Sequence, residues 1–279
     1  MTNDYKTIEI QLGQGVAVLW LNRPEVRNAF DGTLIAELTR ALKAMDADDS
    51  VRAVVIAGQG KAFCAGADLH WMKQMAASDL EANQDDALGL ASMLHTLYTL
   101  SKPTVARVHG AAYAGGLGLI ACCDIAVAAL DTDFCVSEVK LGLAPATISP
   151  YLVRAIGERQ ARRFFLSAEV FTAADAYRFG LVHDIAPLQE LDAAVNQILG
   201  HLIKGGPKAQ AATKELIRAV SGAPITRDLL EETARRIAGL RASDEGRAGL
   251  QSFFERKPAP WTEAITAKSA KPRKRAKKA

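Results

Sequence analysis

The sequence predicts an α/β protein whose second half is helical. In the first half, short apolar runs alternate with amphipathic patterns of helical period, and in the second half helical patterns follow one another almost without a break. Of the 279 residues, 49% are apolar and 23% are charged, which is typical of a packed globular chain and not of a disordered or membrane protein. A chain of this length forms one domain or two.

The first three elements are a strand, a helix and a strand. Residues 16–21 are almost all apolar and end shortly before Pro24, which cannot donate a hydrogen bond to a sheet. Apolar residues then recur every three or four positions over 33–46, which predicts a helix, and 53–57 form a second, fully apolar strand. This order is typical of a parallel crossover.

Short apolar runs for strands and apolar residues every three or four positions for helices also predict the elements that follow. Pro103 ends a long helical pattern, because the residue before a proline avoids the helical conformation. We expect further strands at 104–108 and 125–128, loops at 58–66 and 111–114, and helices at 68–75, 80–100, 115–122, 151–156, 158–166, 172–179, 190–203, 207–220, 227–240 and 244–254.

Basic residues concentrate at the C-terminal end. Seven of the 34 basic residues lie within 268–278, which contains no acidic residue, so the rest of the chain is slightly acidic. Such a body does not suit nucleic acid, and we expect no nucleic-acid partner for it. The composition after residue 260 predicts a disordered tail. We favour a solubilising role for this tail, and binding of a polyanion such as RNA is the lower alternative.

Cysteine usage and the N-terminus indicate a cytoplasmic location. The four cysteines form no Cys-x-x-Cys pair, and we expect them to be reduced and buried: Cys64, Cys122, Cys123 and Cys135. Residues 1–11 lack the features of a signal peptide, and no uninterrupted apolar run reaches the ~18 residues of a membrane span. We therefore expect a cytoplasmic protein with no membrane segment.

One stretch matches a dinucleotide-binding fingerprint. Residues 116–121 read Gly-x-Gly-x-x-Ala, and Glu138 follows at about the distance of the acidic residue in that motif. The glycines, however, lie several residues beyond the end of the strand, so close helix packing explains them at least as well. The histidines show no metal-binding spacing and no Gly-x-Ser-x-Gly segment occurs, so we expect neither a metal site nor a serine triad.

Two helix starts are candidates for binding a developing negative charge. Residues 63–68 lead into a helix that Asp68 can cap, and amides near Ala67 would point out of the helix end. Residues 114–116 have the same arrangement at the next small-residue helix. Two amides that converge from separate turns can form an oxyanion hole for an enolate, whereas two ordinary helix caps are the simpler alternative.

Five motifs in order carry a resemblance to a known family. They are 22–29 (Asn-Arg-Pro-Glu-Val-Arg-Asn-Ala), 63–69 (Phe-Cys-Ala-Gly-Ala-Asp-Leu), 109–116 (His-Gly-Ala-Ala-Tyr-Ala-Gly-Gly), 123–126 (Cys-Asp-Ile-Ala) and 137–145 (Ser-Glu-Val-Lys-Leu-Gly-Leu-Ala-Pro). In order and spacing the chain resembles the enoyl-CoA hydratase/isomerase (crotonase) family. The resemblance implies a spiral of ββα units with a C-terminal helical region that mediates trimers, often paired into hexamers.

The resemblance also implies roles for individual residues. The two oxyanion-hole amides fall on Ala67 and Gly115, and the acid/base falls on Glu138. The substrate-binding residues that it implies are Val26, Arg27, Ala65, Asp68, Leu69, His70 and Tyr113, with Arg27 near the CoA phosphates. No separate cofactor is expected, because coenzyme A is part of the acyl-CoA substrate. The candidates to orient a water molecule are His70, Tyr113 and Tyr151.

Gly118 departs from the wider family, whose best-known hydratases carry a second glutamate there. Residues 66–73, 118–124 and 143–151 resemble the bacterial methylglutaconyl-CoA and isohexenylglutaconyl-CoA hydratase branch, in which glycine also replaces this glutamate. That branch works in leucine and acyclic-terpene breakdown. The leading hypothesis is syn addition of water to a branched, methylglutaconyl-type enoyl-CoA. The alternative is isomerisation of a 3-enoyl-CoA by the same single glutamate.

The resemblance predicts how the chain is divided and assembled. We expect the spiral core at 1–200, the C-terminal helical region at 201–260 and the basic tail at 261–279. We expect a homotrimer, or a hexamer formed as a dimer of trimers.

Overall fold

Strands that add alternately to two sheets determine the fold. The structure is a computed structural model that describes residues 4–262. The larger sheet has the order β1 (Ile8–Gly13), β2 (Val16–Leu21), β3 (Ala53–Gly58), β5 (Thr104–Val108), β7 (Ile125–Ala129) and β10 (Asp184–Ala186). The smaller sheet has the order β4 (Ala62–Cys64), β6 (Ala111–Tyr113), β8 (Asp133–Cys135) and β9 (Phe171–Thr172).

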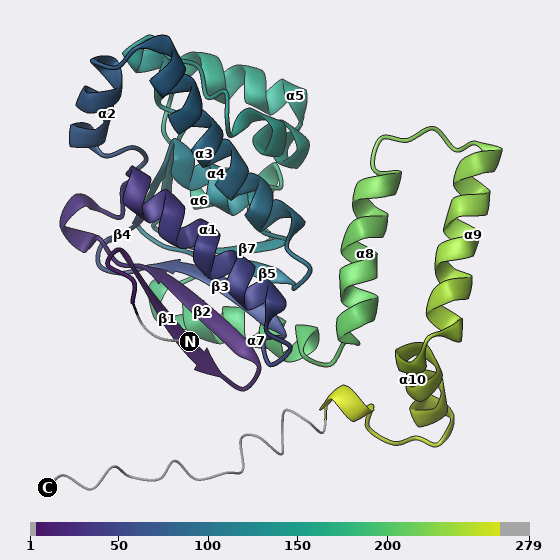
Figure 1. Cartoon of the computed structure of the whole chain (residues 1–279). Coiled ribbons are helices and arrows are strands. Elements are labelled where there is room, and N and C mark those ends of the chain that lie inside the picture. The colour runs from purple at the N-terminus through teal and green to yellow at the C-terminus, as the bar shows by residue number, and fades with distance from the viewer. Residues whose placement is uncertain (1–3, 263–279) are drawn as a thin grey trace, which may run out of the picture.

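Each repeat of the chain places one strand in each sheet and then a helix. The pairs β3 and β4, β5 and β6, and β7 and β8 follow this rule, and the two steps that join these pairs within each sheet are parallel. The helices after the pairs are α2 (Leu69–Ala76) with α3 (Leu80–Thr99), α4 (Gly115–Cys122), and α5 (Ser149–Ser167). The predicted spiral of ββα units is therefore confirmed (Figure 1).

The first predicted crossover is confirmed in detail. Strand β2 pairs in parallel with β3, and α1 (Gly32–Ala47) connects them. Asp31 caps this helix, since its side chain accepts a hydrogen bond from the amide of Leu34 at 2.8 Å. All six residues of β3 are buried, as its unbroken apolar sequence predicts.

Helices cover both faces of the larger sheet. On one face, α7 (Leu191–Leu202) packs three buried residues, Leu191, Val195 and Leu199, against the sheet. On the other face lies the main core, to which α1, α3, α4 and α5 contribute. The short elements η1 (Pro24–Val26), η2 (Glu138–Leu141), α6 (Ala173–Arg178) and η3 (Leu188–Glu190) connect these layers.

The sequence missed the short strands. Residues 111–114 were expected to be a loop, but 111–113 form β6, and β4 and β8 have the same length of three residues. Three residues are too few to show a period of two, and long-range pairing alone makes them strands. The break expected near 157 is confirmed, because Gly157 interrupts α5 with a positive φ of 73°.

Three helices at the C-terminal end stand apart from the body: α8 (Pro207–Val220), α9 (Arg227–Ala242) and α10 (Asp244–Phe254) (Figure 1). Lys214 anchors α8, since its Nζ donates to Asp124 Oδ2 at 2.6 Å and to the carbonyl of Lys102 at 2.9 Å. The division at residue 200 remains a prediction. The predicted tail lies, apart from its first two residues, outside the described residues.

The cysteines match the expectation. All four are free and buried, and burial raises the pKa of the Cys64 thiol to about 12. Within residues 4–262, no helix combines the length and the apolar character needed to cross a lipid bilayer.

Candidate active site

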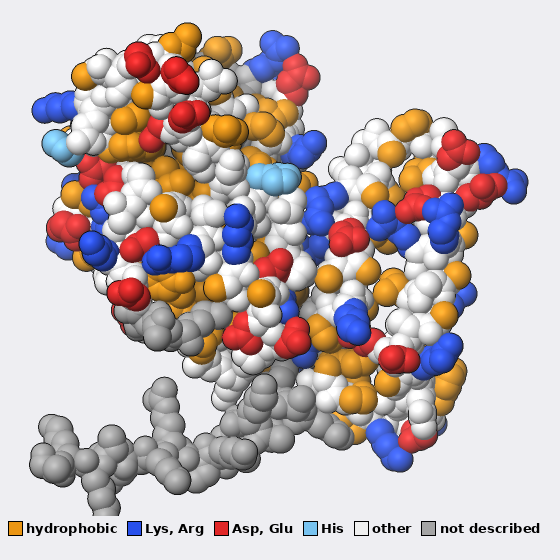
Figure 2. All heavy atoms as spheres, in the orientation of Figure 1, with side chains coloured by type: hydrophobic (Ala, Val, Ile, Leu, Met, Phe, Trp, Pro, Cys, Tyr) orange, Lys and Arg blue, Asp and Glu red, His pale blue; other side chains and the backbone are white. Residues whose placement is uncertain are grey.

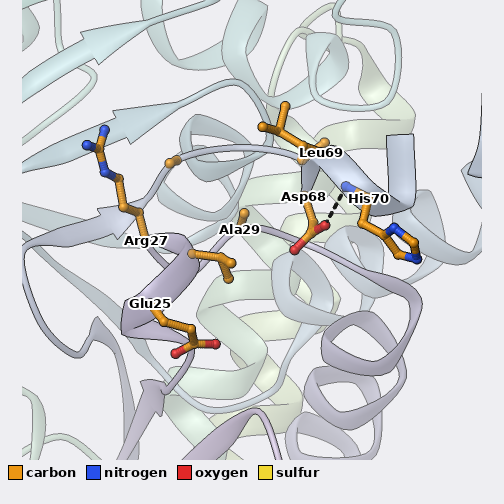
Figure 3. A pocket seen from close by; sticks show the side chains of 9 residues that line it. Glu25, Arg27, Ala29, Asp68, Leu69 and His70 are labelled. Atoms are coloured by element: carbon orange, nitrogen blue, oxygen red, sulfur yellow. Dashed lines mark hydrogen bonds between the residues drawn. The ribbon is translucent and has the colours of Figure 1, made fainter. Parts of the chain in front are cut away.

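Two adjoining hollows lie where the motif segments meet. The inner cavity has a volume of about 540 Å³, and its lining includes Phe30, Ala65, Ala67, Leu69, Trp71, Asp86, Leu90, Gly115, Ser137, Glu138, Thr147 and Ile148. The outer groove has a volume of about 600 Å³ and is lined by Glu25, Val26, Arg27, Ala29, Ala65, Ala67, Asp68, Leu69 and His70 (Figure 3). Because Ala65, Ala67 and Leu69 line both, the two hollows form one continuous channel.

The amide of Ala67 faces this channel without a partner. On one side of the Ala67 segment, the amide of Phe30 donates to the carbonyl of Gly66 at 2.7 Å, and the amide of Asp68 donates to the carbonyl of Phe30 at 2.8 Å. Alternation along an extended segment directs the Ala67 N–H to the opposite side. There it has no hydrogen-bond partner within residues 4–262, so it can donate to a bound ligand.

The amide of Gly115 is the second free donor. Gly115 begins α4, where first-turn amides have no partner inside the helix, and none is found elsewhere in the described part of the chain. The preceding residue, Ala114, has φ 47° and ψ −117°, a conformation that L-residues rarely adopt. Only glycine fits at 115, since a Cβ there would lie 2.9 Å from the ring of Phe30.

The two turns that carry these amides touch each other. A Cβ built on Gly66 would lie 3.1 Å from Cβ of Ala114, and one on Gly116 would lie 2.6 Å from the carbonyl oxygen of Cys64. The glycines of the dinucleotide-like motif therefore serve close packing, as expected. Two free amides on touching turns that line one cavity can bind a single carbonyl oxygen and stabilise the negative charge that develops on it.

Glu138 supplies a carboxylate to the same cavity. It lies at the start of η2, and its Oε2 is buried without a hydrogen-bond partner among the described residues. Burial raises the pKa of the Glu138 carboxyl, and a hydrogen bond from its own backbone amide offsets this only in part. A half-buried carboxylate with a raised pKa and a free oxygen is suited to accept and return a proton.

The outer groove is held by a network that the sequence did not reveal. The guanidinium of Arg23 forms ion pairs with Asp31 and Asp68, each at 3.0 Å. The fully buried Asn28 donates to the carbonyls of Gln59 and Ala62 and accepts from the amide of Arg23. These bonds fix the turn that carries Val26 and Arg27, and the only sequence signal for them was their place inside a family motif.

The remaining predicted residues fall at different places. Arg27 and His70 lie at opposite ends of the outer groove, and Asp68 caps α2 by accepting from the amides of His70 and Trp71 (Figure 3). Tyr113 lines neither the inner cavity nor the outer groove, so the geometry gives no support to its expected contact with substrate. Tyr151 also lies off the channel, where its ring packs 5.2 Å from that of Tyr98.

The space beside Gly118 is already filled. A Cβ there would lie 2.5 Å from Cγ2 of Ile148 and 3.3 Å from Cδ2 of Leu94, both apolar side chains. An acyl group therefore finds no room beside this glycine. A second carboxylate does line the inner cavity, but it is Asp86 on α3.

Comparison with known proteins agrees with this geometry. The family model described as enoyl-CoA hydratase/isomerase matches residues 11–264. The chain belongs to the enoyl-CoA hydratase/isomerase family. An acyl-CoA thioester fits this family as substrate.

Three relatives illustrate the range of this family. A solved enoyl-CoA hydratase from Shewanella pealeana superposes with a TM-score of 0.90 at 41% identity, over 92% of this chain and 97% of that one. The crotonyl-CoA hydratase of Syntrophomonas wolfei is 31% identical over 257 residues, which cover 91% of this chain and 97% of the relative. The 2,3-dehydroadipyl-CoA hydratase of Escherichia coli is 32% identical over 246 residues, 88% of this chain and 94% of the relative.

Proposed function

We propose that this protein adds water to the double bond of a 2-enoyl-CoA thioester, with Glu138 as the acid/base. One observation carries the proposal: the unpartnered oxygen of Glu138 and the free amides of Ala67 and Gly115 all face one cavity. The hydratase names of the relatives favour this reaction over isomerisation.

The proposed chemistry divides between the amides and the carboxylate. The amides of Ala67 and Gly115 bind the thioester oxygen and stabilise the enolate that forms as water attacks. Glu138 accepts a proton from the attacking water, whose oxygen bonds to Cβ, and then returns that proton to Cα. One molecule of water is added and no other reactant is needed. Val26, Arg27, Ala65, Asp68, Leu69 and His70 line the groove that would hold the CoA part.

The lining of the inner cavity supports only part of the methylglutaconyl-type acyl group that the sequence favours. Its branched carbons suit the apolar walls of the inner cavity, including Leu90 and Ile148. Its free carboxylate, in contrast, would meet no basic side chain among the described residues that line the cavity. The relatives named for crotonyl-CoA and 2,3-dehydroadipyl-CoA show that membership of the family leaves the acyl group open.

Isomerisation is the second candidate, because Gly118 provides no second carboxylate and an isomerase needs only one base. Incubation with crotonyl-CoA, 2-hexenoyl-CoA, 3-methylglutaconyl-CoA and a 3-enoyl-CoA, followed by mass spectrometry, separates the two reactions. Hydration adds the mass of one water and removes the enoyl-thioester absorbance. A shift of the double bond at unchanged mass, with no hydration of any 2-enoyl-CoA, would overturn the hydratase proposal.

We also propose that the C-terminal helices assemble the protein into trimers, alone or paired as hexamers, in the cytoplasm. Figure 2 shows exposed hydrophobic side chains on the part of the molecule formed by helices α8, α9 and α10. They include Ile217, Leu230, Ile237, Phe253 and Phe254, each about half exposed or more. Several large apolar side chains exposed on neighbouring helices are typical of a protein interface. Light scattering of the purified protein gives its mass, and a monomer would contradict the proposal.

A further inference from the structure

Asp86 is a charged side chain on the wall of the inner cavity that the proposed reaction does not use. It lies on α3, and Ala87 and Leu90 of the same helix line the cavity with it. Its Oδ1 accepts a hydrogen bond of 3.0 Å from the indole Nε1 of Trp71 on α2. This bond fixes the carboxylate while leaving its negative charge in place, because indole is a neutral donor.

The charged groups of the inner cavity have one sign. Among its described lining residues, the two charged side chains are Asp86 and Glu138, and none is basic. Most of the others are apolar, so the walls screen charge poorly. A further carboxylate brought in by a substrate would lose its hydration without gaining an opposite charge.

The position of Asp86 along α3 separates it from Gly118. Leu94, eight residues further along α3, lies beside Gly118, where the wider family carries its second glutamate. Eight residues of helix span about 12 Å, so Asp86 lies about that far from the Gly118 position along α3. Asp86 therefore borders the inner cavity at a different place from the position of the family's second glutamate.

The surroundings of Asp86 do not neutralise it. Asp79, Glu81 and Asp85 lie on the same end of α3, and Figure 2 shows acidic side chains over this region. On the outer side, Asp86 also borders a surface groove with Arg40 and Lys43 of α1. Neither forms an ion pair with Asp86 in the described part of the chain, and Arg40 is placed over the ring of Tyr5 at 4.7 Å.

We propose that Asp86 is a specificity-determining residue that selects against acyl-CoA thioesters whose acyl chain ends in a carboxylate. This inference rests on the proposed function, and it assigns that function to neutral acyl chains. A dicarboxylic enoyl-CoA would place its terminal charge in the part of the cavity that Asp86 borders, where repulsion raises the free energy of binding.

Hydration of two six-carbon substrates tests this proposal. Wild type should favour 2-hexenoyl-CoA over 2,3-dehydroadipyl-CoA by about 30-fold in kcat/KM, as expected for two charges roughly 8 Å apart at an effective dielectric constant near 20. Asp86→Asn can keep an oxygen for Trp71 and removes the charge, so the ratio should fall below about fivefold. Asp85→Asn, an exposed neighbour that lines neither hollow, should leave the ratio unchanged. The ratio does not depend on the fraction of each variant that folds.

A binding measurement separates this proposal from the proposed function. Hexanoyl-CoA and adipyl-CoA are saturated and do not react, and their Kd values by calorimetry should differ in wild type and converge in Asp86→Asn. Equal affinities in wild type, or a ratio that Asp86→Asn leaves unchanged, would overturn the specificity role. If the Kd values differ as expected but no enoyl-CoA is hydrated, the proposed reaction fails and the role of Asp86 in binding stands.

Discussion

Asp68 and Glu138 border the same channel from two different turns, and their pKa values are shifted in opposite directions. Burial alone would raise the pKa of Asp68, but hydrogen bonds from His70, Trp71 and Arg23 outweigh it and hold that pKa below its usual value. Glu138 has no comparable donors within residues 4–262, so burial raises its pKa. Asp68, whose carboxylate accepts several hydrogen bonds, stabilises the fold. Glu138 keeps an oxygen without a hydrogen-bond partner, and this oxygen is free to accept and return a proton.

The segments around the two carboxylates also differ. Asp68 lies on a turn joined by ion pairs and backbone bonds to Arg23 and Phe30. Glu138 lies on a one-turn helix whose last residue is followed by Gly142 with φ 74°, and the chain beyond it supplies apolar residues to the cavity wall. The stabilising contacts thus lie at the outer groove, whereas the unfavourable burial of a charge lies at the inner cavity.

The largest effect should come from Glu138→Gln. The amide keeps the shape of the side chain but cannot accept the proton, so kcat should fall by about 10²- to 10⁴-fold. Steady-state hydration of the best 2-enoyl-CoA measures this fall. Glu158→Gln, at an exposed glutamate that forms an ion pair with Arg162, is the matched control and should keep the wild-type rate.

Substitution at Gly118 should reduce stability through overpacking against Ile148. Gly118→Ala should cost about 1–3 kcal/mol in the free energy of unfolding, and Gly118→Glu should cost more and lose hydratase activity. The control is Gly89→Ala, since Gly89 lies in helix α3 with open space around it, so alanine there should be neutral or stabilising. Urea denaturation measures the free energy of unfolding of each variant and of wild type. Equal stabilities of the two alanine variants would refute the packing explanation.

Asp68→Ala should affect stability more than chemistry. It removes a helix cap and an ion pair with Arg23, for a loss of about 1–2 kcal/mol. Asp79→Ala removes only the cap of α3 and should cost less. Both variants should keep kcat within about threefold of wild type, because neither carboxylate takes part in the proposed proton transfer. A kcat loss in Asp68→Ala as large as that of Glu138→Gln would remove the contrast between the two carboxylates.

The pH dependence should have opposite signs at the two positions. The raised pKa of Glu138 means that its ionisation destabilises the fold, so the melting temperature of Glu138→Gln should exceed that of wild type increasingly as the pH rises above about 4.3. The lowered pKa of Asp68 contributes stability above about pH 3.9, so the deficit of Asp68→Ala should shrink as the pH falls below that value. Thermal melts across pH measure both trends.

Activity should follow the ionisation of Glu138. Because its pKa is raised, the acid limb of kcat/KM should lie above the ordinary glutamate range near 4.3. An acid limb at or below that value would mean that a different group accepts the proton.

The sequence predicted the elements and residues that have local signals. Strand β3 and helix α1 were predicted because five consecutive apolar residues, 53–57, and a regular helical face are visible in the sequence. Ala67 and Gly115 were singled out from helix starts with small residues, and the family motifs added Glu138. These signals lie within a few neighbouring residues.

The sequence could not predict features that depend on contacts between distant segments. Asp86 reads as one more solvated charge in a polar run, and only its contact with Trp71, fifteen residues away, places it on the cavity wall. Asn28 is buried because it pairs with residues more than thirty positions away. The filling of the space at Gly118 by Ile148 likewise depends on how α4 and α5 pack.

The proposed reaction divides its work between two groups, since the amides of Ala67 and Gly115 polarise the thioester and Glu138 moves the proton. A chromophoric cinnamoyl-CoA thioester reports polarisation through the red shift of its absorbance on binding, and the same samples give the hydration rate. We predict that Glu138→Gln keeps the red shift and the affinity of wild type while its hydration rate falls at least about 100-fold. A variant that hydrates within about threefold of the wild-type rate, or that loses the red shift together with the rate, would contradict this division.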